Sequence, residues 1–95
     1  METLAKRFFV SGRVQGVGFR FFAERTATRL GVSGFVRNLF DGRVEVYAVG
    51  STEQIGAMKE ALAHGPRMAQ VYRVDEVDAE ILPKFANVFS IEREE

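Results

Sequence analysis

The stretch KRFFVSGRVQGVGFRFFAERTATRLG, residues 6–31, decides the fold, because its pattern changes from that of a strand to that of a helix across one turn. Apolar and aromatic residues at 6–14 predict a strand. Apolar residues then recur at helical spacing from Phe19, and Gly31 supplies a C-terminal stop for this helix. The glycines of the turn between the two are Gly12, Gly16 and Gly18. A strand therefore leads through a glycine-rich turn into a helix N-terminus.

The rest of the chain continues with periodic patterns that end at turn residues. The further predicted elements are a strand at residues 34–40, a hairpin turn at Asp41-Gly42, a strand at 43–49, a helix from Ser51 to Gly65-Pro66, a strand at 71–81 and a short edge strand at 87–92. Ser51 and Gln54 have the spacing of a capping box at the start of the second helix. Val74 and Val77 break the alternation of the fourth strand, which predicts a bulge near Asp75.

This order of elements, β-α-β-β-α-β, predicts the ferredoxin-like βαββαβ sandwich of the α+β class. We expect an antiparallel sheet with both helices on one face, a short fifth strand at its edge, and a single domain over residues 1–95. Because many unrelated functions use this fold, the fold alone does not indicate a function.

Composition excludes several classes of site. The 95 residues contain no cysteine and one histidine, which excludes thiol nucleophiles, disulfides, thiolate metal sites and His-based metal clusters. No apolar run approaches the ~20 residues of a membrane span, and residues 1–7 lack the layout of a signal peptide. We therefore expect a soluble, cytoplasmic protein with no membrane partner.

The net charge is zero, but the two halves of the chain differ. Residues 1–43 carry eight Lys or Arg and three Asp or Glu, a balance of +5, whereas residues 44–95 carry five and ten, a balance of −5. This asymmetry favours an anion site built from the N-terminal half, although it also fits random local imbalance on a solvated surface. The neutral total argues against nonspecific nucleic-acid binding.

The segment Gly12–Arg20 has the features of an anion-binding loop. Backbone N–H groups at a helix N-terminus have no intrahelical partner, and the helix dipole adds partial positive charge there. Gly16 and Gly18 can adopt positive φ, which lets successive N–H groups converge as a nest. Arg20 lies one residue past the buried stripe and adds a planar fork that matches two phosphate oxygens. The same pattern also fits a structural glycine turn followed by a surface arginine.

Two other phosphate motifs are absent from this segment. A dinucleotide-binding G-x-G-x-x-G motif is excluded because Phe21 stands where its third glycine would be, three residues after Gly18. No Gly-Lys-Ser/Thr of a Walker loop occurs in the chain. A nucleotide-binding fold is therefore not expected.

Residues 12–20, Gly-Arg-Val-Gln-Gly-Val-Gly-Phe-Arg, resemble the signature of the acylphosphatase family around its phosphate loop. A second block of that family follows at residues 34–38, Gly-Phe-Val-Arg-Asn, and then at Gly42-Arg-Val44 and Gly50, with a matching separation. The resemblance implies an enzyme that hydrolyses the carboxyl–phosphate bond of acyl phosphates without cofactor or metal. It implies a small acyl phosphate as substrate and inorganic phosphate or other anions as inhibitors. We expect this enzyme to be a monomer.

The resemblance also implies the residues of the site. Arg20 and Asn38 would be the catalytic residues, with Arg20 on the phosphate and Asn38 on the attacking water. The residues that would bind the substrate phosphate are Gln15, Gly16, Val17, Gly18, Phe19 and Arg20. Asparagine is poor in β-propensity, so Asn38 in a strand needs a reason, and water binding supplies one. Without the second block, the preferred interpretation would be that Asn38 satisfies the turn at Asp41-Gly42.

Two alternative functions use the same fold. A noncatalytic anion-binding or regulatory module would share the loop and Arg20 but would have no use for Asn38. An RNA-binding module is disfavoured by the neutral charge and by the missing aromatic spacing at residues 34–36. The same sequence also resembles an N-terminal domain of large hydrogenase-maturation carbamoyltransferases, for which this chain is too short. The phenylalanines that we interpret as core residues are Phe8, Phe9, Phe19, Phe21, Phe22 and Phe35.

Overall fold

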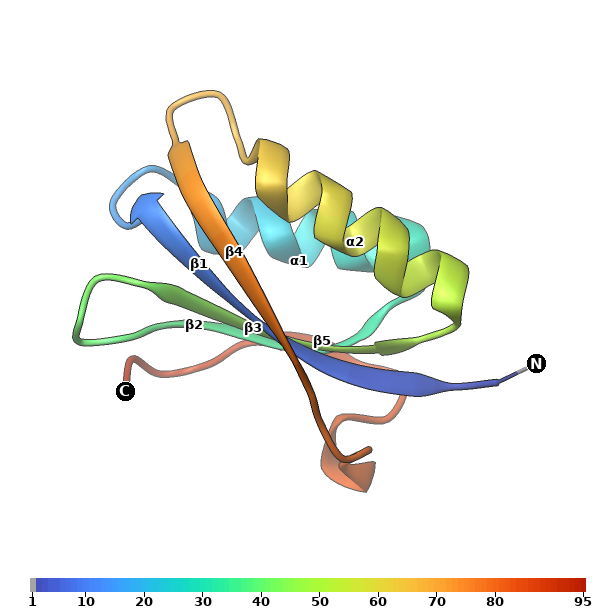
Figure 1. The fold of residues 1–95 in the computed structure, drawn as a ribbon. Coiled ribbons are helices and arrows are strands. Elements are labelled where there is room, and N and C mark those ends of the chain that lie inside the picture. Colours follow the sequence, from blue (N-terminus) through green and yellow to red (C-terminus); the bar gives the residue numbers. More distant parts are fainter. Residues whose placement is uncertain (1) are drawn as a thin grey trace.

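The computed structural model describes residues 2–95, in which two helices cover one face of a five-stranded sheet (Figure 1). In chain order the elements are β1 (Leu4–Arg13), α1 (Phe19–Leu30), β2 (Ser33–Asn38), β3 (Val44–Gly50), α2 (Thr52–His64), β4 (Gln70–Asp78), the 3₁₀ turn η1 (Pro83–Phe85) and β5 (Phe89–Ile91). This order confirms the predicted ferredoxin-like α+β fold and its short fifth strand.

The strands lie in the order β4-β1-β3-β2-β5, so β3 is the middle strand and lies between β1 and β2. β1 runs antiparallel to both β3 and β4, and β2 runs antiparallel to β3. β5 pairs with β2 in parallel, which corrects the expectation of a wholly antiparallel sheet. Between β4 and β5 the chain crosses the helix-free face and reverses near η1, so it reaches the far edge running in the direction of β2.

The main core lies between the sheet and the two helices. The buried apolar stripe of α1 contains Phe19, Ala23 and Ala27, and that of α2 contains Ile55, Met58 and Leu62. They pack against the buried side chains of the central strands, which are Phe8 and Val10 of β1 and Val44, Val46 and Ala48 of β3. This packing fixes the N-terminus of α1 at the end of β1. Neither helix among residues 2–95 is long and apolar enough to cross a bilayer.

β2 and β3 approach each other closely at Gly34, the first residue of the second sequence block. A Cβ at this position would lie 1.8 Å from the carbonyl oxygen of Tyr47, and φ of Gly34 is +138°. Both facts require glycine, because any other residue would overlap the neighbouring backbone and strain its own. The contact holds β2 against β3 just upstream of Asn38.

The predicted bulge in β4 exists, but it does not lie near Asp75. Asp75 pairs regularly with Phe9, and the register shifts instead between Ser11 and Gly12, which leaves Tyr72 as the extra residue of β4. The bulge puts Val71 and Val74 on the same face, where both pack against the main core. Val77 breaks the alternation for another reason, since it lies 46% exposed opposite Arg7 in the register.

The phenylalanines predicted as core residues divide into four groups. Phe8 and Phe19 belong to the main core, and Phe35 belongs to a second cluster with Ala5, Tyr47 and Phe85 on the helix-free face. Phe9 and Phe22 are partly buried. Phe21 is 65% exposed, so its interpretation as a core residue is wrong. Phe21 lies two residues past Phe19 on α1, which turns its side chain to the opposite side of the helix.

The turns and caps follow the sequence signals with one difference. Ser51 and Gln54 form the predicted capping box, with Gln54 N–H donating to Ser51 Oγ at 3.1 Å and Ser51 N–H donating to Gln54 Oε1 at 2.8 Å. The hairpin turn between β2 and β3 is longer than Asp41-Gly42 alone, because Gly42 N–H donates to Leu39 O and Leu39 N–H donates to Arg43 O. The three residues between Leu39 and Arg43 therefore form a turn with a bulge.

Candidate active site

The loop between β1 and α1 leaves a run of backbone amides without partners. Within residues 2–95, none of the amides from Gln15 to Phe21 donates to a backbone carbonyl. Gly18, the N-cap of α1, has no side chain to cap the helix. Gly16 and Gly18 have φ of +74° and +79°, the left-handed conformation that directs successive N–H groups to one side. The predicted positive φ at these two glycines is therefore confirmed.

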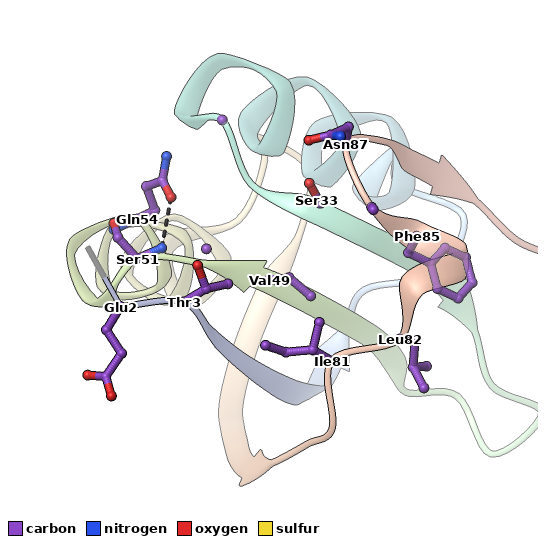
Figure 2. Close-up of a pocket in the computed structure, with 13 residues that line it drawn as sticks. Glu2, Thr3, Ser33, Val49, Ser51, Gln54, Ile81, Leu82, Phe85 and Asn87 are labelled. Carbon is purple, nitrogen blue, oxygen red and sulfur yellow. Dashed lines mark hydrogen bonds between the residues drawn. The ribbon is translucent and has the colours of Figure 1, made fainter.

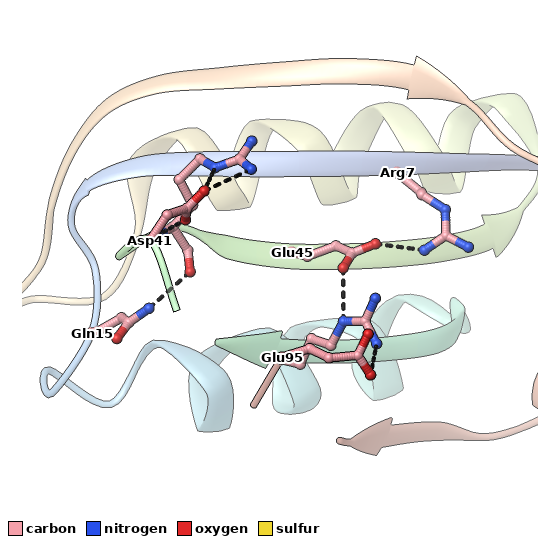
Figure 3. A network of polar contacts seen from close by, with 7 residues as sticks. Arg7, Gln15, Asp41, Glu45 and Glu95 are labelled. Atoms are coloured by element: carbon pink, nitrogen blue, oxygen red, sulfur yellow. Dashed lines mark hydrogen bonds and ion pairs between the residues drawn. The ribbon is translucent and has the colours of Figure 1, made fainter. Parts of the chain in front are cut away.

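Two side chains of this loop point away from its amides. Val17 packs against the main core. Gln15 reaches toward the β2–β3 turn, and its Nε2 donates to Leu39 O at 2.8 Å and to Arg43 O at 2.9 Å. Figure 3 shows the second of these two bonds. Because both side chains make contacts outside the loop, the loop itself is lined by backbone groups at these two residues.

A small cavity lies between the loop, the first turn of α1 and the end of β2. Its volume is about 110 Å³, and its lining residues are Val14, Gly16, Gly18, Phe19, Arg20, Phe21 and Asn38. The cavity thus brings together Arg20 and Asn38, which are 18 residues apart in the sequence. Of the predicted phosphate-binding residues, Gln15 and Val17 do not line it. Val14 and Phe21 line it without having been predicted, since an apolar side chain beside a motif carries no chemical signal.

Arg20 differs from the arginines of the hairpin in having no ionic partner. Its side chain makes no hydrogen bond or ion pair in the part of the chain that the structure describes. Arg43, in contrast, binds Asp41, and the hydrogen bonds from its guanidinium and its backbone N–H hold the pKa of the Asp41 carboxyl below its ordinary value. Arg37 donates to Glu45 at 2.7 Å. Arg20 is therefore the cation at the cavity that remains available for an anion.

Asn38 carries the second unpaired polar group of the cavity. Its Oδ1 is closed off from solvent and has no hydrogen-bond partner. Among residues 2–95 it is the one buried side-chain nitrogen or oxygen atom without a partner. An unpaired buried group of this kind costs roughly 1–3 kcal/mol. Such groups are rare in folded proteins, and a functional role is one of their recognised causes.

The lining of the cavity limits its chemistry. None of its seven lining residues is an aspartate, a glutamate or a histidine. Among residues 2–95, no three His, Asp or Glu side chains gather closely enough to hold a metal ion. The arrangement offers amide donors, one guanidinium and one carboxamide, which together can bind an anion and orient a neutral molecule beside it.

A larger cavity of about 360 Å³ lies at the C-terminal end of α1, on the other side of the molecule from the loop (Figure 2). Its one charged lining residue is the acidic Glu2. Ser51 and Gln54 also line it, but their polar atoms bind each other in the capping box. This cavity is therefore unsuited to a phosphate group, in spite of its size.

Known proteins resemble this chain over almost its whole length. The family model described as Acylphosphatase matches residues 6–91. A protein named Acylphosphatase from Solibacter usitatus (strain Ellin6076) is 51% identical over 81% of this chain and 80% of its own length. A protein of the same name from Pasteurella multocida (strain Pm70) is 55% identical over 77% of this chain and 81% of its own length. The crystal structure of acylphosphatase from Bacillus subtilis superposes with a TM-score of 0.87 and 36% identity, covering 94% of this chain and 98% of that one.

Substitution of Gly18, which has left-handed φ, tests whether the loop amides bind phosphate separately from their effect on stability. Gly18→Ala meets no atom within 4 Å, but the alanine must leave φ of +79° or carry its strain, about 1–2 kcal/mol. Losing one well-placed amide should weaken the binding of inorganic phosphate roughly tenfold. The measurement is phosphate titration by calorimetry, together with urea unfolding.

Gly31→Ala is the matched control, because Gly31 has the same φ of +79° at the other end of α1. This variant should lose at least as much stability, because the added Cβ would also lie 2.9 Å from Gln54 Nε2, but it should keep the phosphate affinity of the parent chain. Equal affinities for phosphate in both variants would mean that the amides of the loop do not bind the anion.

Proposed function

Since the chain belongs to the acylphosphatase family, we propose that the loop between β1 and α1 holds the phosphoryl group of the substrate and that Asn38 orients the attacking water. The activity is the hydrolysis of the carboxyl–phosphate bond of acyl phosphates to a carboxylate and inorganic phosphate. The observation that carries the proposal is the single small cavity that joins the unpaired loop amides and Arg20 to Asn38.

Binding of the phosphoryl group falls to the loop and Arg20. The amides of residues 15–19 donate to the phosphoryl oxygens, and the positive end of the α1 dipole adds to their attraction for a dianion. The Arg20 guanidinium donates two further charge-assisted hydrogen bonds, for which it has no competing partner among residues 2–95. Because these donors are already fixed by the fold, they stabilise the equatorial oxygens without reorganising during the reaction.

The water molecule attacks phosphorus in line with the bond to the carboxyl oxygen. As the new P–O bond forms, the P–O bond to the acyl group breaks, and the carboxylate leaves with the electron pair. A carboxylate is a good leaving group, so this step needs little acid catalysis. Asn38 orients the water through its carboxamide, from its place in the same cavity as Gly16, Gly18 and Arg20.

The proton of the attacking water needs an acceptor. Because no carboxylate or imidazole lines the cavity, we assign this role to an oxygen of the substrate's own phosphate. A pH–rate profile with a limb that follows an enzyme histidine would contradict this assignment.

Three further properties follow from the composition and the site. We propose that the chain forms a single domain over residues 1–95, that it acts as a monomer in the cytoplasm, and that inorganic phosphate and other anions inhibit it by occupying the loop. The absence of cysteine suits a reducing compartment, although it does not require one. Light scattering of the purified protein at micromolar concentration tests the monomeric state.

The purified protein should hydrolyse benzoyl phosphate, a simple acyl phosphate, at the same rate with and without a strong chelator. The reason is that the amides and Arg20 supply the charge stabilisation that a metal ion supplies in other phosphoryl-transfer sites. Release of phosphate measures the rate. Complete inactivation by the chelator, reversed by a divalent cation, would overturn the metal-free mechanism. No hydrolysis under any condition would favour the noncatalytic anion-binding module instead.

Arg20→Ala should abolish most of the turnover of benzoyl phosphate and weaken phosphate inhibition as well. Two charge-assisted hydrogen bonds are lost, each worth about 1.5–3 kcal/mol. Arg20→Lys should fail nearly as badly, because an ammonium group cannot present the two-pronged fork. Arg25→Ala removes another exposed arginine of α1, one that does not line the cavity, and should leave the kinetics unchanged. Near-normal turnover of a folded Arg20→Ala variant would contradict the proposal.

Asn38→Ala should lower kcat on the order of 10²–10³-fold while phosphate inhibition changes little. The side chain is assigned to the water rather than to the bound anion, so ground-state binding of phosphate does not depend on it. Steady-state kinetics with phosphate as a competitive inhibitor measures both constants. If phosphate inhibition weakens as much as kcat falls, the role assigned to Asn38 is wrong.

A further inference from the structure

The side chain of Gln15 joins two parts of the site that the sheet does not join. Its Nε2 donates to Leu39 O at 2.8 Å and to Arg43 O at 2.9 Å, and these two residues flank the β2–β3 turn. Leu39 directly follows Asn38, and the register partner of Asn38 is Val44, which directly follows Arg43. Gln15 therefore holds the base of the hairpin that carries Asn38.

No strand pairing joins the loop directly to the base of this hairpin. β3 lies between β1 and β2, and the pairing of β1 with β3 ends at Val10 and Val44. Beyond Val10, β1 pairs with β4 alone. In the described part of the chain, the two bonds of Gln15 are the polar contacts between residues 14–21 and residues 38–44. Gln15 thus supplies the polar link between the loop and the hairpin, beside the apolar packing of Val14, Phe19 and Val44 in the main core.

We propose that Gln15 is a positioning residue that sets the place of Asn38, and so of the attacking water, relative to the bound phosphoryl group. This inference rests on the function proposed above. The phosphoryl donors, the loop amides and Arg20, belong to one segment and keep their mutual geometry without Gln15. Asn38 is the one polar lining residue that belongs to the other segment. Loss of the bridge should therefore displace the water and not the anion.

The geometry excludes a direct contact of the Gln15 side chain with phosphate. A carboxamide nitrogen has two hydrogens, and two backbone carbonyls accept from it here. The remaining polar atom, Oε1, is an acceptor that a phosphate oxygen repels. The side chain of Gln15 is therefore a positioning group and not a phosphate ligand.

The test is a double-mutant cycle of Gln15→Met and Asn38→Ala, assayed with benzoyl phosphate. Methionine keeps the length of the side chain but has no donor. Alone, Gln15→Met should lower kcat about 10- to 100-fold, since a displacement of about 1 Å has effects of this size. The inhibition constant of inorganic phosphate should change less than about threefold. With Asn38→Ala already present, Gln15→Met should lower kcat by less than about threefold, because the group that it positions is gone.

Gln54→Met is the matched structural control. Gln54 also donates its Nε2 to a backbone carbonyl of another segment, that of Leu30 at 3.0 Å, but at the opposite end of α1. This variant should lose stability in urea unfolding and keep kcat. The effect of Gln15→Met on stability should be the same with and without Asn38→Ala, whereas its effect on kcat should not.

Two results would overturn the inference. An equal loss of kcat in both backgrounds would mean that Gln15 acts independently of Asn38, and a loss of phosphate affinity in proportion to kcat would mean that it shapes the loop. Near-normal kcat of Asn38→Ala alone would instead contradict the proposed function itself, so the two failures are distinguishable.

Gln15→Glu gives a second route if Gln15→Met does not fold. A carboxylate cannot donate to the two carbonyls, but a protonated carboxyl can donate to one of them. The kcat of this variant, expressed as a fraction of the parent value at each pH, should rise as the pH falls below about 6, because the facing carbonyl oxygens raise the pKa of the new carboxyl above ~4.3. A fraction that stays constant over pH would contradict the bridging role.

Discussion

The site depends on one condition of the backbone, which is that the amides between β1 and α1 remain without partners. Gly16 and Gly18 meet this condition by adopting left-handed φ, which no branched residue tolerates at low cost. The neighbouring side chains support it by leaving the loop in opposite directions, Val17 into the core and Gln15 onto the hairpin. The amide donors of the loop, which only water can satisfy in the free protein, are thereby fixed in a geometry that suits an anion.

The sequence predicted the parts of the fold and of the candidate site that follow from local rules. The glycine-rich turn before Phe19, the capping box at Ser51 and the hairpin near Asp41 each depend on a few adjacent residues. The parallel entry of β5, the bulge at Tyr72 and the bridge from Gln15 depend on segments that are distant in the chain. No local pattern carries that information, because a glutamine that binds a distant carbonyl looks like a glutamine on the surface.

The charge asymmetry of the two halves has a second explanation in the structure. Lys6 forms ion pairs with Glu76 and Asp78 across the edge of the sheet. Arg7 and Arg37 both bind Glu45, which is 3% exposed and belongs to the C-terminal half of the chain (Figure 3). Many of the excess basic residues of the N-terminal half therefore form ion pairs with excess acidic residues of the C-terminal half. What distinguishes Arg20 is that it lines the cavity and has no ionic partner among residues 2–95, rather than the surplus of basic residues.

The strand order also governs how quickly the molecule can fold. β2 and β3 form the one hairpin between adjacent segments, whereas β1 must wait for partners from the middle and the end of the chain. Closing such long loops costs chain entropy before any stabilising contact forms. A topology of this kind therefore folds more slowly than a helical bundle of the same length. The hairpin with Asn38 can form early, but the loop with Arg20 acquires its neighbours only when β1 docks. Arg20 and Asn38, the catalytic residues of the proposed function, should therefore come together late in folding.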